Sequence, residues 1–290
     1  MAAVTVSFLY DFEHVDDKGR VHIMHEFAAN GAKHLVLSGT LIRKILVNHS
    51  MISQLNEEMA GAGLSFADAH AVFGKFLDLN CPVEKARPQM LLRHELSLQI
   101  AADMGVKTIT IHTGNENAYP EYDVDTQTGY LKKSLDHLLP VAEKLGITIC
   151  IENIWHRINT PERLLEVKSC FPTDALGFCY DAGHANLMDK GRSNPESNPC
   201  QAWGSDTPSW DDHILEKMLP HVVNCHLHDN CGVNDQHRNP GAGNIDWDHI
   251  MQLLGQAPRL EVIQSEVIPV MVNAPIRSIC DKFAELVRKM

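Results

Sequence analysis

Short apolar segments alternate with longer segments of helical periodicity along the whole chain of 290 residues. Eight of the apolar segments have the length and the β-branched content of strands. We expect strands at Val4–Leu9, His34–Leu37, Leu64–Ala69, Thr108–His112, Thr148–Glu152, Leu176–Asp181, Val222–His228 and Glu261–Glu266. Their nearly continuous hydrophobic character is typical of a parallel sheet that is covered on both faces.

The intervening segments carry helix start and stop signals. We expect helices at Pro88–Met104, Leu131–Leu145, Pro161–Cys170, Asp211–Leu219, Trp247–Leu254 and Ala274–Lys289. Thr160, Pro161 and Glu162 supply a cap, a first-turn proline and an early acid in that order. Eight regular strand–helix units predict a single (β/α)8 TIM barrel over residues 1–290, although a doubly wound sheet is the alternative.

One segment interrupts this rhythm after the sixth predicted strand. Residues 186–212 are rich in Ser, Asn and Pro and contain Trp203 and Trp210. The segment is too long for a plain connection. It is predicted to be either a surface insertion or a lid whose tryptophans cover the site, and a homo-oligomer contact through it stays open.

Composition narrows the class of protein. A hydrophobic content of 44% is ample for a full core, and a formal charge of −12 provides no basic stripe, so a nucleic-acid partner is not expected. The cysteines are scattered without a C-x-x-C pair, which favours reduced, buried thiols and a cytoplasmic location. The first residues indicate a strand rather than a signal peptide, and no apolar run is long enough for a membrane span.

Metal-competent residues recur at the carboxyl ends of the predicted strands, where the strands of a barrel converge. They are His70, His112, Glu152, Asp181, His226, His228 and Glu266, with His184 just after the sixth strand. A lone histidine at such a position is more often structural, but this joint occurrence is hard to attribute to packing. Burial of so many ionisable groups requires compensation, which a divalent metal provides.

The types of donor narrow the choice of metal. Mixed carboxylate and imidazole donors suit Mn²⁺, Zn²⁺, Co²⁺ or Fe²⁺ better than Ca²⁺, and we expect Mn²⁺ first. Strand alternation places His226 and His228 on one face, and we favour His226 as the ligand. Asp235 and His237 follow on a glycine-containing loop, where they are either further ligands or part of a solvated turn.

The motifs His112-Thr-Gly, Ile-Glu152-Asn, Asp181-Ala-Gly-His184, His226-Leu-His-Asp, Asp235-Gln-His237-Arg and Ser-Glu266 resemble the xylose isomerase-like TIM-barrel superfamily, nearly over the whole chain. The superfamily includes sugar phosphate isomerases and epimerases and endonuclease IV. In the isomerase members, the resemblance implies one metal held by Glu152, Asp181, the His226/His228 pair and Glu266. In endonuclease IV, it implies three zinc ions that also use His70, His112, His184, Asp235 and His237.

The resemblance implies an enzyme that isomerises or epimerises a small sugar or sugar phosphate. Glu152 and Glu266 would transfer protons next to a metal-bound carbonyl. The substrate would be contacted by His70, His112, Trp155, His184, His228 and Arg238, and Trp203 could add to an aromatic wall. Ketose 3-epimerases usually carry a second glutamate where this chain has Ile158, so that particular reaction is in doubt. The alternatives are a zinc phosphodiesterase acting on abasic DNA and a metal-dependent lyase or hydratase acting on a sugar derivative.

Overall fold

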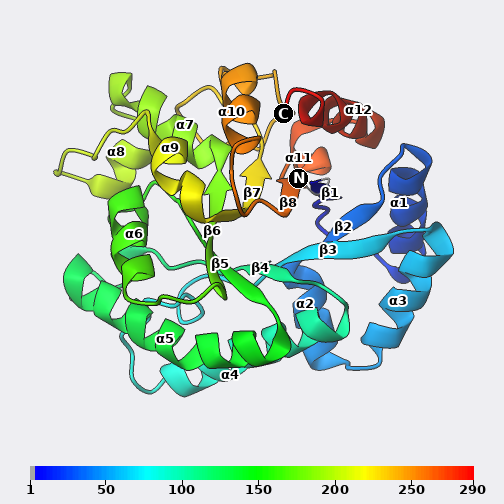
Figure 1. Cartoon of the computed structure of the whole chain (residues 1–290), viewed down its shortest axis with the longest axis horizontal. Coiled ribbons are helices and arrows are strands. Elements are labelled where there is room, and N and C mark those ends of the chain that lie inside the picture. Colours follow the sequence, from blue (N-terminus) through cyan, green and yellow to red (C-terminus); the bar gives the residue numbers. More distant parts are fainter. Residues whose placement is uncertain (1–3) are drawn as a thin grey trace.

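The computed structural model describes residues 4–290. Its eight strands are parallel and pair in sequence order, and β1 also pairs with β8, so the sheet closes into a barrel surrounded by helices (Figure 1). Each predicted strand is found within two residues of its expected ends. The strands are β1 (Thr5–Phe8), β2 (His34–Leu37), β3 (Ser65–His70), β4 (Thr108–Thr110), β5 (Thr148–Glu152), β6 (Leu176–Asp181), β7 (Val222–Leu227) and β8 (Val262–Ser265). The predicted TIM barrel is therefore confirmed.

Helices occupy the connections between the strands. The α-helices are α1 (Asp17–Ala29), α2 (Gly39–Val47), α3 (Met51–Ala62), α4 (Arg87–Asp103), α5 (Val124–Leu145), α6 (Pro161–Ser169), α7 (Ala182–Lys190), α8 (Asn198–Trp203), α9 (Ile214–Met218), α10 (Trp247–Leu254), α11 (Pro269–Val272) and α12 (Ile276–Val287). Four 3₁₀ turns complete the described elements: η1 (Glu116–Ala118), η2 (Arg157–Asn159), η3 (Gly191–Ser193) and η4 (Leu219–His221). No helix within residues 4–290 is both long enough and apolar enough to cross a membrane.

Helix α5 begins seven residues before the predicted start at Leu131. The side chain of Asp123 caps it by accepting a hydrogen bond from the Thr126 N–H (2.7 Å). The buried face of its first turns carries Gln127 and Thr128 rather than apolar residues. The hydrophobic period therefore starts later than the helix does.

The segment 186–212 is more regular than its composition suggested. It contains the end of α7, then η3 and α8. Trp203 is buried, and its indole N–H donates to the backbone oxygen of Trp155 (2.8 Å). Trp203 and Trp210 are not among the described residues that line the cavity at the carboxyl end of the barrel, and the tryptophan lid and the wall role of Trp203 stay predictions.

Candidate metal centre

The structure brings together all nine predicted donors at the carboxyl end of the barrel. Parallel strands deliver them there because alternate residues of each strand point inward. β3, β5, β6 and β7 supply His70, Glu152, Asp181 and His226 directly. The remaining donors follow strand ends or lie in the first turn of α7 and the loop before α10: His112, His184, Asp235, His237 and Glu266.

His226 lies at the middle of the cluster and is fully buried. Its Nδ1 lies 3.0 Å from Glu152 Oε1, 3.5 Å from Glu266 Oε1 and 3.9 Å from an oxygen of Asp181. A tetrahedral ion with bonds of about 2.1 Å holds its donors roughly 3.4 Å apart. The three carboxylate oxygens therefore lie at distances from His226 Nδ1 that suit donors of one divalent ion.

A second group of donors flanks this centre on the β3–β4 side. The ligand atoms of His70, His112 and Glu152 lie within 4.8 Å of one another. His112 Nε2 is 3.2 Å from Glu152 Oε2, an atom that is buried and makes no hydrogen bond to a described residue. Glu152 thus connects this group to the central one.

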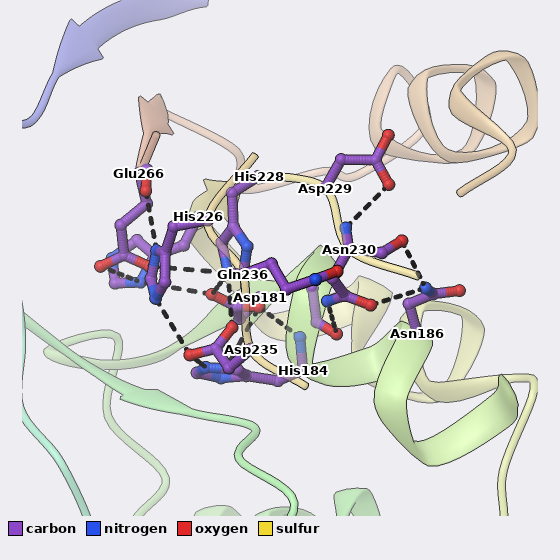
Figure 2. Close-up of polar contacts among 12 residues, drawn as sticks. Asp181, His184, Asn186, His226, His228, Asp229, Asn230, Asp235, Gln236 and Glu266 are labelled. Atoms are coloured by element: carbon purple, nitrogen blue, oxygen red, sulfur yellow. Dashed lines mark hydrogen bonds and ion pairs between the residues drawn. The ribbon is translucent and has the colours of Figure 1, made fainter. Parts of the chain in front are cut away.

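Figure 2 shows a third group, in which His184, His228 and Asp235 point toward one another beside Asp181 of the central group. Asp235 Oδ2 accepts from His237 Nε2 (2.9 Å) and lies 3.5 Å from His184 Nε2. Its other oxygen is buried and makes no hydrogen bond to a described residue. Asp235 and His237 are therefore part of the donor cluster and not of a solvated turn.

His228 points inward like His226 but meets different partners. Its Nε2 lies 3.2 Å from Asp181 Oδ2, and its ring stacks on the ring of His237 with centroids 4.1 Å apart. Gly183 makes room for it: a Cβ added at Gly183 would lie 2.0 Å from His228 Cε1. The imidazole of His228 is therefore held tightly between α7 and the loop after β7.

The surroundings of the central group shift the pKa values of its two glutamates in opposite directions. Burial raises the pKa of Glu152, but the opposing effects of His226 and His112 prevail and hold it well below the ordinary value. Burial and the nearby carboxylates of Asp181 and Glu152 raise the pKa of Glu266, although His226 and His237 oppose this. Two carboxyl groups on one cavity whose pKa values move apart are suited to act as a base and an acid.

The histidines also differ in their pKa values. Burial lowers the pKa of His226, but Glu266 and Glu152 raise it to about 10, and Asp235 and Glu266 likewise raise that of His237 to about 9 against burial. Burial, together with the neighbouring histidines, lowers the pKa of His70 to about 3. His226 and His237 must therefore lose protons before either can bind a metal.

Asp229 anchors the loop that carries Asp235 and His237, a role that the sequence analysis missed. Its carboxylate accepts from the N–H of Gly241 (2.7 Å) and from the indole of Trp247 (2.9 Å). Its backbone pairs with that of Arg238 (2.7 and 2.9 Å). This pairing turns the loop back over the barrel, and Asp229 itself points away from the donors (Figure 2).

A cavity of about 460 Å³ opens above the cluster. Trp155 and His156 line it on the β5 side, and Trp155 packs edge-on against His184, with ring centroids 4.9 Å apart. The loop after β3 adds Phe73 and Lys75, which sequence reasoning did not single out. Among the described residues, Arg238 is not part of this lining, and its guanidinium donates to the Ala242 oxygen (3.3 Å).

Comparisons with known proteins agree with this architecture. A protein of Methanocaldococcus jannaschii, described as uncharacterised, is 24% identical over 234 residues, which is 75% of this chain and 71% of that protein. A D-tagatose 3-epimerase-like protein superposes with a TM-score of 0.74 at 19% identity, covering 99% of this chain and 97% of the other. The IolI protein with a bound zinc atom superposes with a TM-score of 0.71 at 16% identity, covering 99% of both chains.

The family assignment comes from a sequence model. The model described as "Xylose isomerase-like TIM barrel" matches residues 36–262, most of the chain. The matched region contains β3 to β7 in full and eight of the nine donors, all except Glu266. The chain therefore belongs to the xylose isomerase-like TIM barrel family.

Proposed function

We propose that this protein is a divalent-metal-dependent isomerase or epimerase of a sugar or sugar phosphate. One observation carries the proposal: Glu152 and Glu266 both approach His226 Nδ1, at 3.0 and 3.5 Å, at the base of the cavity. Two carboxyl groups on either side of one substrate can remove and return a proton. The D-tagatose 3-epimerase-like name of one structural neighbour supports sugar chemistry.

A metal would be held by Glu152, Asp181, His226 and Glu266. When bound, a divalent ion polarises a carbonyl and makes the neighbouring C–H more acidic. The zinc atom in the IolI structure supports a divalent metal in general. Mn²⁺ as the working ion stays our prediction, with Zn²⁺, Co²⁺ and Fe²⁺ as alternatives.

The chain's own residues would supply the proton transfers and the orientation of the sugar. Glu152, which stays ionised, is suited to accept a proton from the carbon next to the carbonyl. Glu266, whose pKa is raised, is suited to deliver one. Trp155 lines the cavity and could stack on a sugar ring, and His184 lines it and could hydrogen-bond a hydroxyl group.

The position of Ile158 bears on which reaction is catalysed. Ile158 is fully buried, so it presents no side chain to the cavity. Our expectation that ketose 3-epimerization as such is not the reaction therefore stays in place. An aldose–ketose isomerization, or epimerization at another carbon, uses the same pair of glutamates.

The test is solvent deuterium incorporation into a panel of keto sugars and their phosphates, followed by NMR, with protein purified without chelator. Wild-type protein should exchange a C–H next to the carbonyl, and Glu152→Gln or Glu266→Gln should reduce the rate by at least about 100-fold. Glu57→Gln, on the exposed surface of α3, is the matched control. Near-normal exchange in either glutamate variant would refute the assignment.

A second function is favoured by the gathering of all nine donors into three adjoining groups. This arrangement suits a multi-zinc hydrolase, with a phosphodiester in abasic DNA as the substrate to test. Metal content per chain separates the two proposals. About one ion, with activity that survives His237→Gln, supports the isomerase, whereas two or three zinc ions and loss of activity in that variant support the hydrolase.

A further inference from the structure

A second hollow of about 480 Å³ lies beside the cavity over the donors. The two share His70, Phe73, His237 and Glu266 in their walls. They are therefore two lobes of one cavity, and we call the second the side lobe. A ligand whose reacting atoms lie at Glu266 can extend into the side lobe without leaving the protein surface.

The walls of the side lobe are chemically unlike the donor cluster. The segments after β1, β2, β3 and β8 build most of it, and the larger part of its exposed wall is apolar, with Leu9, Tyr10, Ala71, Val72, Phe73, Leu77 and Ile268 in the lining. Polar side chains, among them Asp11, Ser38, Thr40 and Arg93, complete the lining. Charged residues lie at its rim, where Arg43 and Glu13 form an ion pair with each other. The lobe thus offers an apolar surface to whatever the donor cluster holds.

Exposed apolar side chains lie in or next to the segments that build the side lobe. Phe73 is 58% exposed, and Val270 and Met271, shortly after Ile268, are 67% and 68% exposed. Apolar groups gathered around a cavity mark a binding surface more often than scattered ones do. A free sugar, which is polar around its ring, leaves these groups in contact with water.

We propose that the substrate is a keto sugar that carries an apolar aglycone, with the sugar over the donors and the aglycone in the side lobe. This inference rests on the proposed sugar function. Cavities of roughly 300–1,000 Å³ hold drug-sized ligands, so two connected lobes of about 460 and 480 Å³ exceed what one sugar ring fills. Binding of the non-reacting aglycone would help to orient the reacting carbon between the two glutamates.

The experiment compares glycosides that differ only in the aglycone. A glycoside has no open-chain carbonyl, so the probes carry a ketone at ring carbon 3, as methyl, octyl and phenyl β-D-3-ketoglucosides, with D-fructose as the free sugar. Isothermal titration measures affinity, and NMR follows deuterium exchange. The phenyl and octyl probes should bind about tenfold or more tightly than the methyl probe.

Thr40→Trp is the diagnostic variant, because Thr40 lines the side lobe and lies outside the donor cluster. It should abolish the preference for phenyl and octyl probes while affinity for the methyl probe changes less than about twofold. Val47→Trp, at the 86% exposed last residue of the same helix, is the control and should change nothing. Tyr10→Ser removes one wall of the lobe and serves if the Thr40→Trp protein does not fold.

The outcomes distinguish failure of the aglycone site from failure of the proposed sugar function. Equal affinity for methyl, octyl and phenyl probes, or equal loss of all three in the Thr40→Trp protein, overturns the aglycone site and leaves the sugar function intact. Absence of binding and exchange with every probe, D-fructose included, contradicts the proposed function and with it the aglycone site.

Discussion

Replacement of Gly183 by alanine is the sharpest test of how tightly the donor cluster is packed. The new Cβ would lie 2.0 Å from His228 Cε1 and 2.5 Å from His228 Nδ1, far inside the 3.5–4.0 Å at which carbon atoms attract each other. The imidazole is fully buried, with Asp181 at 3.2 Å and the ring of His237 stacked on it. It cannot withdraw without breaking one of these contacts.

The magnitude follows from two opposed effects. Overpacking in a rigid interior costs about 1–3 kcal/mol, and sometimes more. Alanine offsets up to about 1 kcal/mol of this as a better helix former, although less near a helix start, where Gly183 lies. We expect Gly183→Ala to lower the free energy of unfolding by about 2 kcal/mol and to reduce metal content, because His228 and Asp181 both move.

The assay is urea unfolding followed by circular dichroism, together with metal analysis. Gly129→Ala is the matched control, since Gly129 lies inside α5 and a Cβ there has no atom within 4 Å. The same chemical change should there raise the free energy of unfolding by roughly 0.5–1 kcal/mol. If Gly183→Ala equals the wild type in stability and metal content, the packing argument around His228 is wrong.

Three further predictions concern charge. Glu58→Ala should lower the free energy of unfolding by about 2 kcal/mol in urea titrations, because the buried guanidinium of Arg20 loses its bidentate partner (2.7 Å) and keeps only Asp17 (2.9 Å). Exposed Glu57→Ala should have almost no effect. Burial holds the pKa of His94 below its ordinary value, so as the pH decreases His94 takes up a proton in the unfolded chain before it does so in the folded one. The contribution of His94 to stability is therefore full above about pH 6.5 and falls as the pH decreases toward its folded pKa. His94→Gln should flatten that acid limb by up to about 1.4 kcal/mol per pH unit, and an unchanged limb would contradict the assignment. Zn²⁺ added to chelator-treated protein at pH 7 should release at least one proton, because the pKa of His226 is raised to about 10. Calorimetry in two buffers of different ionisation enthalpy would detect this proton. Zero release would refute a role for His226 as a ligand.

The barrel was predictable because its strands are nearly continuous apolar runs of the right length. The start of α5 was not, because Gln127 is buried there and its amide donates to the carbonyl oxygens of Glu116, Tyr119 and Tyr122. A buried polar residue whose hydrogen bonds are all made inside the protein cannot be told from a surface residue by sequence pattern. Only the folded loop supplies those three acceptors.

Part of the candidate site was likewise predictable from the sequence, and part was not. The inward direction of Glu152 and His226 follows from strand alternation, which the sequence displays. The approach of Asp235 to His184 depends on a loop, and that loop is anchored by backbone N–H groups that bind Asp229. The hydrogen bond that Trp203 donates to the Trp155 carbonyl oxygen has no signal in the sequence.

The position of β8 as the last strand has a consequence for the order in which the donor cluster is assembled. Glu266 immediately follows β8, and β8 pairs with β7, so Glu266 reaches His226 only when the last strand has joined the sheet. During synthesis, a chain that has emerged as far as the start of α10 already contains the other eight donors but lacks the carboxylate that completes the central group. The full central group is therefore complete only after the last strand has been made, and a metal that needs all four side chains would bind late.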